Sequence, residues 1–507
     1  MTAGGERFLN RHLNDGSAAQ RPCKEETGAA FGSGHMIPSP TPPVRVREPD
    51  RSGRAPSPEW IEELISPNHL ARYLWEALGT LDLTPILQKA RARQGHAGSS
   101  VLSPRMVLTL WLYGYTQGVT AARPLAELTR TAPAYRWIVG NLHISHDKLS
   151  EFRAEHGEAF SGLLTAILTH LQERDFLKLD VVGRDGTRTR AAASAASWRS
   201  YGALLERRRQ AQLQLKAVEF LASENDPEYT LAQHIRRKAA AQEYLQRIEA
   251  ALEVSRRLHA ERKPAVEKER ARARAARGDA HGKAEIALIR VSTTDPEARV
   301  MKMPDAGYRP AYNVGYSVSG SPLGGPRTIV GVNVTNIGSD MKELEPAVEE
   351  IKRRTGQLPK AVLADANHAQ HQGIAALMKQ DVKALVSPPK GTLPMEKLEA
   401  LRKKAPEVAA WRELMRTPEA RELFRARAGL SELMNAHQKG IHKLRQFVVR
   451  GLEKVTAAVL LGALAFNLVQ HRNHWFAPLK AAGNGTLAAA APPLAGRLPE
   501  GRFSDRP

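Results

Sequence analysis

The feature that most constrains the fold is a change in the spacing of apolar residues near residue 176. Before it, apolar residues recur at helical intervals; after it, short β-branched runs alternate with helical segments. Strands are predicted over FLKLDVVGRD, RPAYNVGYSVSG and PRTIVGVNVTN, the last two joined by the turn GSPLGGP. A helix follows over DMKELEPAVEEIKRRTG, a strand over PKAVLADA, a helix over AQHQGIAALMKQ and a strand over VKALVSPP. This order predicts a mixed α/β sheet flanked by helices.

The segments on either side of that sheet divide the chain into four predicted regions. Residues 1–55 are rich in Gly, Pro, Ser and Arg without periodicity, which predicts a disordered basic arm. Residues 56–172 predict an all-helical domain, in which Ser66 and Ser103 are N-cap candidates, each followed by a proline. Residues 173–475 carry the α/β domain, and residues 476–507 predict a flexible Gly/Ala/Pro tail.

A long polar stretch interrupts the α/β domain at residues 200–285. It is helical in pattern and carries arginine-rich patches at 207–209, 236–238 and 256–277. A helical hairpin or coiled-coil-like insertion is the simplest prediction. Such a segment contacts DNA, mediates dimerisation or is merely a solvated surface, and the sequence leaves these three open.

Charge and cysteine content limit the partners and the compartment. The 507 residues include 74 Lys and Arg against 53 Asp and Glu, a net charge of +21. Such an excess favours a polyanionic partner, most often DNA or RNA. The single cysteine, Cys23, cannot form an internal disulfide, which fits a reducing cytoplasm. The longest apolar stretch, Val455–Val469, is shorter than the ~20 residues of a membrane span, so a soluble protein with a buried core helix is expected.

Three acidic residues occupy positions from which they could act together. Asp185 ends the first predicted strand, Asp365 ends the strand after the hairpin, and Glu432 opens a helical segment. If the two strands are neighbours, both aspartates can point out of the same edge of the sheet. Phosphoryl transfer by two metals needs carboxylates that hold the ions ~3.5–4 Å apart, and Mg²⁺ requires few of them because it keeps several waters. By spacing alone, each of the three is more often a surface carboxylate or a helix cap.

Several longer stretches carry motifs that occur together in one family. They are VVGRDGTRTRAAASAASWR, STTDPEARVMKMPDAGYRPAYNVGYSV, VLADANH and SELMNAHQKGIHKLRQFVVRGLEKVTAAVLLGALAFNL. Together they resemble bacterial insertion-sequence transposases of the DDE class. The similarity extends back through NHLARYLWEALGTLDL, SPRMVLTLWLYGYTQGV and HDKLSEFRAEH, and covers roughly residues 60–475. DGTRTRA, STTDPEAR and RGLEKV are specific in combination, whereas each alone is a weak signal.

The resemblance implies a ribonuclease H-like catalytic core behind an all-helical N-terminal domain. It implies that Asp185, Asp365 and Glu432 are the catalytic carboxylates and the ligands of two Mg²⁺ ions, for which Mn²⁺ can substitute. Glu343 and Glu413 are weaker alternatives for the third position. The residues after Asp365 are Ala-Asn-His, where the family more often has a Gly-aromatic turn.

The implied activity is metal-dependent cleavage at element ends, followed by attack of the freed 3′-hydroxyl on target DNA. The implied partners are double-stranded DNA, namely the terminal inverted repeats and the target, and further copies of the chain in a dimer or larger assembly. The implied location is the bacterial cytoplasm, at the nucleoid. Two alternatives stay open: a metal-dependent nuclease without strand transfer, and an inactive transposase derivative that only binds DNA.

Other polar residues are assigned structural roles. His143, His146 and His156 lack the carboxylate or cysteine company of a zinc site. His368 and His371 are expected at a solvent-facing helix start, and Asp295 in a turn. Arg445, Arg450 and Lys454 either bind the DNA backbone or pair with Glu453. The sequence holds no GxxxxGK[ST] motif for nucleotide binding.

Overall fold

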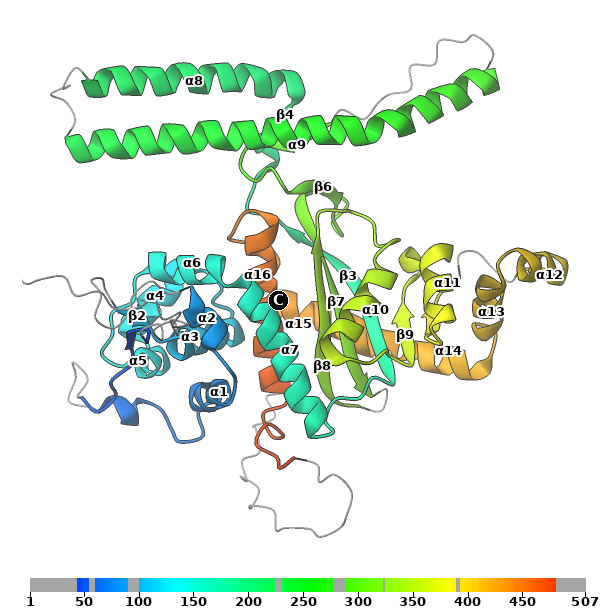
Figure 1. The fold of residues 1–507 in the computed structure, drawn as a ribbon, viewed down its shortest axis with the longest axis horizontal. Helices are drawn as coiled ribbons and strands as arrows, with labels where there is room; N and C mark the ends of the chain where they lie inside the picture. Colours follow the sequence, from blue (N-terminus) through cyan, green and yellow to red (C-terminus); the bar gives the residue numbers. More distant parts are fainter. Residues whose placement is uncertain are drawn as a thin grey trace, which may run out of the picture. The chain divides into compact units, whose positions relative to one another are not determined.

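A computed structural model describes residues 43–53, 60–89, 100–223, 230–277, 289–321, 324–388 and 393–479. Figure 1 shows these elements, coloured along the chain. Residues 1–42 and 54–55 of the predicted arm, residues 224–229 and 278–285 of the predicted insertion and residues 480–507 of the predicted tail lie outside this description.

The central sheet has six strands, and Asp185 and Asp365 lie within or directly after two neighbouring strands of it. The order is β10 (Lys383–Val386), β9 (Ala361–Ala364), β3 (Val181–Arg190), β7 (Tyr308–Ser321) and β6 (Arg299–Lys302), and β8 (Gly324–Thr335) also pairs with β7. Strands β10, β9 and β3 are mutually parallel, whereas β3–β7, β7–β8 and β6–β7 are antiparallel. The predicted mixed sheet is therefore present.

One strand boundary differs from the prediction. Strand β3 continues for five residues beyond Asp185, to Arg190. Residues 182–190 pair without interruption with residues 311–319 of β7. The long antiparallel partner supplies hydrogen bonds for the polar sequence GRDGTRTR, so Asp185 lies within a strand rather than at its end.

Helices pack against the sheet, and further helices follow its last strand in the sequence. Helix α10 (Leu344–Thr355) contacts β8 and α11 (His371–Lys379), and α13 (Pro406–Leu414) contacts α11 and β10. Gly356 ends α10 in a left-handed conformation with φ 71°, as its sequence position predicts. The remaining elements of this part are η3 (Ala366–His368), α12 (Met395–Lys404), α14 (Pro418–Arg425), the π-helical turn η4 (Ala428–Glu432), α15 (Leu433–Gly440) and α16 (Leu452–Gln470).

The N-terminal part is mainly helical. Its elements are η1 (Ile61–Leu64), α1 (Leu70–Gly79), α2 (Thr84–Gln88), α3 (Pro104–Thr116), α4 (Ala122–Thr131), α5 (Pro133–Val139), α6 (His146–Glu155) and α7 (Gly157–Glu173). Ser103 caps α3 as predicted, since its hydroxyl accepts from the Met106 amide. Ser66 does not cap α1; that helix starts later, and the His69 ring accepts from the Ala71 amide instead.

The last residues of the predicted arm pack against these helices. Strand β1 (Val46–Arg47) pairs in parallel with β2 (Val101–Leu102), a short strand within the region predicted to be all-helical. Arg51 lies between two tryptophans, with its guanidinium carbon 4.1 Å from the Trp75 ring centroid and 4.2 Å from that of Trp137. Its Nε donates to the Trp137 carbonyl at 2.8 Å. These cation–π contacts hold Arg51, a residue of the predicted disordered arm, against the helices.

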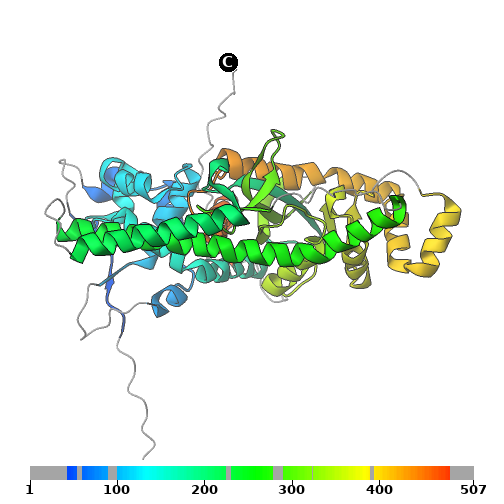
Figure 2. The same cartoon turned by 90° about the horizontal axis from the view of Figure 1, so that it is seen from above.

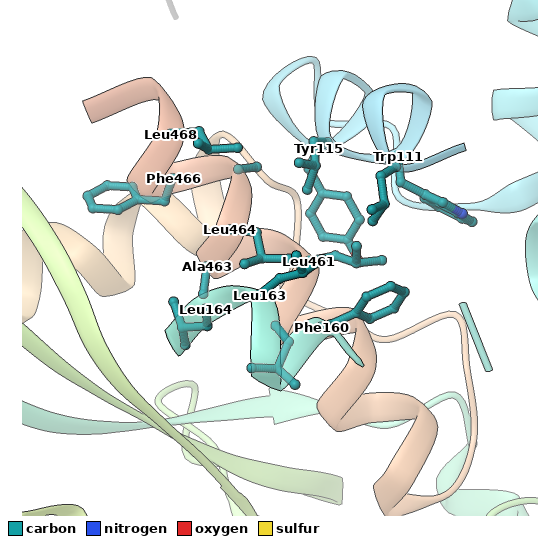
Figure 3. Packing of buried hydrophobic residues seen from close by; sticks show 14 of the residues in the cluster. Trp111, Tyr115, Phe160, Leu163, Leu164, Leu461, Ala463, Leu464, Phe466 and Leu468 are labelled. Carbon is teal, nitrogen blue, oxygen red and sulfur yellow. The ribbon is translucent and has the colours of Figure 1, made fainter. Parts of the chain in front are cut away.

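Helix α16 joins the N-terminal helices to the sheet. It contacts α3, α6 and α7 on one side and β8 on the other, and its leucines pack with Trp111, Tyr115 and Phe160 in one continuous cluster (Figure 3). By length and composition it could cross a membrane, but 72% of its apolar window is buried inside the structure. Its one buried amide, Asn467, pairs with the backbone of Ile329 in β8 at 2.8 and 2.9 Å. This is the pattern of a core helix.

The insertion forms a pair of antiparallel helices, seen side by side in Figure 2. Helix α8 (Tyr201–Ser223) packs along α9 (Leu231–Arg277) through its own apolar cluster, which includes Leu204, Ile248 and Leu252. Two short antiparallel strands, β4 (Trp198–Ser200) and β5 (Arg290–Ser292), close its base, next to the short turn η2 (Ala195–Ser197). The predicted helical hairpin is present.

Candidate active site

The register of two parallel strands brings Asp185 and Asp365 together. Val181 in β3 pairs with Ala361 in β9, and Gly183 pairs with Leu363. Continuing this register by two residues places Asp185 level with Asp365, with both side chains on the same face of the sheet. Asp365 directly follows the last residue of β9, as predicted. We call Asp185 and Asp365 the carboxylate pair.

The two carboxylates influence each other electrostatically. Burial, and then the negative charge of Asp365, raise the pKa of Asp185, while the positive charges of Arg427 and His368 oppose the shift. Two like charges in a partly desolvated site favour a bound cation or a proton between them. The pair therefore has the electrostatic character of a cation site.

Asp365 is held by the turn that follows it. Its Oδ1 accepts from the Asn367 amide at 3.0 Å and from His368 Nδ1 at 2.9 Å, and its Oδ2 accepts from Asn367 Nδ2 at 2.9 Å. Although burial acts to raise the pKa of Asp365, these hydrogen bonds together hold it below its usual value. The carboxylate is thereby kept ionised and fixed in orientation.

His368 differs from the sequence-based expectation. Its side chain is 1% exposed and faces Asp365, whereas a solvent-facing position was expected. The short η3 turn after Asp365 points the ring inward, which helical spacing from the later α11 could not reveal. His371, by contrast, is exposed as expected and lies near Trp411, with ring centroids 6.2 Å apart.

The C-terminal segment reaches the same face of the sheet. Asn435 Nδ2 in α15 donates to Asp185 Oδ2 at 2.9 Å. The preceding turn η4 contacts β3 and β7, and a Cβ on Gly183 would lie 2.7 Å from Leu430 Cβ and Ser431 Oγ. Gly183 and Asp185 are two residues apart and share a face, so the missing side chain lets η4 approach beside the carboxylate.

Glu432 lies at the end of η4 but does not join the carboxylate pair. Its Oε1 forms an ion pair with Arg427 at 2.9 Å, and its side chain is 58% exposed. It precedes Asn435, the residue that touches Asp185, by about one helical turn. Among the described residues, no group of three or more His, Cys, Asp and Glu side chains is arranged to hold a metal ion. The structure thus brings two of the three predicted residues together, and the three-ligand set stays a prediction.

The opposite face of β3 carries a buried cation. Arg184 is 2% exposed, and its nearest carboxylate is Glu343, at 3.9 Å. Glu343 also accepts from Asn333 Nδ2 at 3.1 Å. The Glu343 side chain therefore lies on the face of the sheet opposite to the carboxylate pair. The sequence did not identify Arg184 as a functional residue. The only indication was the presence of an arginine within a strand predicted to be buried.

The other alternative for the third carboxylate lies on a different element. Glu413 in α13 pairs with Arg402 at 2.7 Å, and both side chains are part-exposed. Asp180, which precedes β3, pairs with Lys360 at 2.7 Å. Neither residue is among the main influences on the pKa of Asp185. Glu432 remains the acidic residue next to the segment that contacts the pair.

The motifs STTDPEAR and RGLEKV meet in space. Asp295 is fully buried and accepts from the Tyr312 hydroxyl at 2.8 Å and from the Gly451 amide at 3.3 Å. Glu297 Oε2 accepts from the Leu452 amide at 2.8 Å. Burial raises the pKa of Asp295. Asp295 does lie in a turn, as predicted, and that turn also anchors the first residues of α16.

The comparison with family models concerns the N-terminal helices. Residues 59–155 match the model of a family described as a transposase domain (DUF772). The match supports a transposase-family protein. We call residues 59–155 the transposase domain; it spans η1 to α6. Searches of curated proteins and of solved structures found no match to the chain.

Proposed function

We propose that the chain is a DNA transposase of the DDE class. The observation that carries the proposal is the carboxylate pair, held level on neighbouring parallel strands in a chain whose N-terminal part matches a transposase domain. The substrates are double-stranded DNA ends of the element and the target DNA. The net charge of +21 supports a polyanionic partner. The enzyme acts in the bacterial cytoplasm, as a dimer or larger assembly.

We propose a ribonuclease H-like core for this enzyme. The order β10-β9-β3-β7-β8 supports it, because an antiparallel meander of three strands, β3, β7 and β8, is extended at β3 by two parallel strands that follow helical connections. In this arrangement the first strand lies at the centre and receives the fourth as its neighbour. The first two catalytic aspartates then come from those two strands.

The carboxylate pair fits a magnesium site. Both donors are carboxylate oxygens, which Mg²⁺ prefers, and their mutual repulsion would be relieved by a cation. Within the described residues, Asn435 is the only hydrogen-bond donor to the Asp185 carboxylate, so that group keeps acceptor capacity. Two bound Mg²⁺ ions, or Mn²⁺, would activate the attacking oxygen and stabilise the leaving oxygen.

Glu432 can complete the site by a change of side-chain rotamer. It lies about one turn before Asn435, and its side chain is largely exposed, so packing does not hold it against Arg427. Arg427 lowers the pKa of Asp185, so its charge also acts on the pair. Opening the Arg427–Glu432 ion pair would free the third carboxylate.

The residues of the chain then have distinct roles in two successive displacements. Asp185, Asp365 and Glu432 would hold the ions, while His368 and Asn435 fix the orientation of the aspartates. In the first displacement, water forms a bond to the scissile phosphorus and the P–O3′ bond breaks, which leaves a 3′-hydroxyl. In the second, that hydroxyl attacks a target phosphorus and displaces another 3′ oxygen. The number of phosphodiester bonds is conserved in the second step, so no nucleotide hydrolysis is needed.

Substitution of the acidic residues tests the proposal. Asp185→Asn and Asp365→Asn should each abolish Mg²⁺-dependent strand cleavage and leave duplex binding intact. Glu432→Gln should lose cleavage and Mg²⁺ binding, whereas the matched control Glu413→Gln, at a surface ion pair, should retain both. Magnesium-dependent cleavage retained by both aspartate variants would exclude this active site. Cleavage by the wild type without joining of pre-cut ends would identify a nuclease without strand transfer, and binding with no cleavage an inactive derivative.

A further inference from the structure

A second polar site lies away from the carboxylate pair, where the transposase domain meets the start of α16. It is a cleft of about 320 Å³ between α6, the residues after β3 and the segment that leads into α16. Figure 1 shows α6 beside the upper part of α16. Arg153, Arg450, Lys454 and Ser150 supply its polar groups, and alanine and valine side chains supply the rest. Among the described residues that line it, none is acidic. We call it the basic cleft.

Arg153 is a fixed and buried cation in this cleft. Its residue is 3% exposed, its Nη1 donates to the Thr120 carbonyl at 2.7 Å, and its guanidinium carbon lies 4.4 Å from the Trp111 ring centroid. In the part of the chain that the structure describes, no ion pair includes it. A buried guanidinium without a carboxylate is costly, because it loses hydration without gaining a counter-charge. An anion that enters the cleft would supply that charge.

Arg450 and Lys454 stand at the mouth of the cleft, and both are exposed. The ion pairs between described residues do not join either of them to Glu453. The amides of Gly451 and Leu452, where α16 begins, already donate to Asp295 and Glu297. These two amides are therefore not available to a ligand, and the proposed anion-binding groups are the basic side chains.

The basic cleft lies just beyond the end of the strand that carries Asp185. The backbone of Arg190, at the end of β3, pairs with Arg445 and Phe447, at 3.2 and 2.8 Å, and Ala192 lines the cleft two residues later. Seven residues separate Asp185 from Ala192, which corresponds to at most ~23 Å of extended chain at ~3.3 Å per residue. A duplex advances ~3.4 Å per nucleotide along its axis. The cleft is therefore within about seven base-pair steps of the carboxylate pair.

We propose that the basic cleft binds a backbone phosphate of the DNA strand that enters the active site. Arg153 and Arg450 contact the phosphate, Lys454 adds charge, and the apolar walls accept the adjoining deoxyribose. The proposal rests on the proposed function, because it takes DNA as the ligand. It assigns the transposase domain a direct contact with the strand being cut, through Arg153 on α6.

Salt-dependent binding tests this assignment without relying on catalysis. The full chain is titrated into a fluorescent random-sequence duplex in EDTA over a range of salt concentrations. The double variant Arg450→Ala/Lys454→Ala should reduce the slope of log K against log salt by about one, since the cleft binds one phosphate and each lost phosphate contact removes about one released counterion. Lys403→Ala, an exposed lysine on α12, should leave the slope unchanged. A double variant with the slope of Lys403→Ala would overturn the proposal.

Arg153→Lys provides a second measurement that preserves the buried charge. It should weaken duplex binding about tenfold at constant salt, because a lysine cannot make the planar two-pronged contact of a guanidinium. Unchanged affinity in a folded variant would contradict the phosphate contact. Displacement of the duplex by thymidine 5′-monophosphate at equal concentration would overturn a DNA site in favour of a free-nucleotide site. If the double variant shows the reduced slope but the wild-type chain never cleaves DNA, the proposed function is refuted and the phosphate site in the cleft is supported.

Discussion

His368 offers the sharpest test of how the active site is organised. The ring is 1% exposed, its Nδ1 lies 2.9 Å from Asp365 Oδ1, and its buried Nε2 has no hydrogen-bond partner among the described residues. The contact with Asp365 is thus its main polar interaction. We predict that His368→Ala slows strand cleavage by releasing Asp365, although His368 itself need not touch the DNA.

The size of the effect follows from that single hydrogen bond. A hydrogen bond to a charged group contributes roughly 1.5–3 kcal/mol, and each ~1.36 kcal/mol corresponds to a tenfold change in rate. The cleavage rate should therefore fall about 10–150-fold, in line with the effect of residues that orient metal ligands. His368→Asn retains a donor and should recover part of the loss. His371→Ala removes an exposed histidine three residues away and should change the rate by less than about twofold.

The assay is single-turnover cleavage of a labelled duplex that carries the element end, with enzyme in excess and Mg²⁺ varied. A positioning role predicts that more Mg²⁺ restores part of the lost rate, and that duplex binding is unchanged. Thermal unfolding of the same variants separates loss of orientation from loss of structure. If folded His368→Ala cleaves as fast as His371→Ala at every Mg²⁺ concentration, His368 does not hold Asp365 for catalysis.

Two further predictions concern stability. Burial, and then the charge of His474, lower the pKa of the fully buried His471 to about 4. The unfolded chain therefore binds a proton at this histidine below about pH 6.5, whereas the folded chain does not. The free energy of unfolding should fall as the pH drops from 6.5 towards 4, by about 2 kcal/mol at pH 5. Urea unfolding at both pH values checks this, and His471→Asn should show a smaller difference. Gly315→Ala should destabilise the chain by about 1–3 kcal/mol, because its Cβ would press on the buried Arg184 guanidinium. Gly331→Ala, with Ser317 atoms at 3.3 Å, should cost less, and equal effects in denaturant titration would contradict the Arg184 argument.

The strands of the sheet were predictable where burial of the strand produces a run of apolar residues in the sequence. The segment PKAVLADA gave both the strand β9 and the position of Asp365 after its last residue, because parallel strands buried on both faces are nearly continuous in apolar residues. The extent of β3 was not predictable, because GRDGTRTR is polar and its strand character comes from pairing with β7, more than 120 residues later. Long-range pairing of this kind leaves no local periodicity.

The local environment of the candidate site was less predictable than its position. Motif resemblance pointed to Asp185 and Asp365, and strand register supports their proximity. The inward turn of His368 depends on three residues of η3, too short a segment to carry a pattern. The ion pair of Glu432 with Arg427 is a choice between rotamers of an exposed side chain, and the sequence contains no record of that choice.

The continuous apolar cluster around α16 limits where the chain can be cut into fragments that stay folded. Its members come from the N-terminal helices, from β3, β7 and β8 and from α16 itself, so a cut after residue 172 would expose apolar surface on both fragments. The transposase domain is therefore not a cassette that can be exchanged between chains. The α8–α9 hairpin is the opposite case, because its apolar cluster is completed by Ile289 and Val291 at β5 and, in the part of the chain that the structure describes, shares no residue with the cluster around α16. The α8–α9 hairpin is therefore the better place for a fused domain, a tag or an exchanged segment.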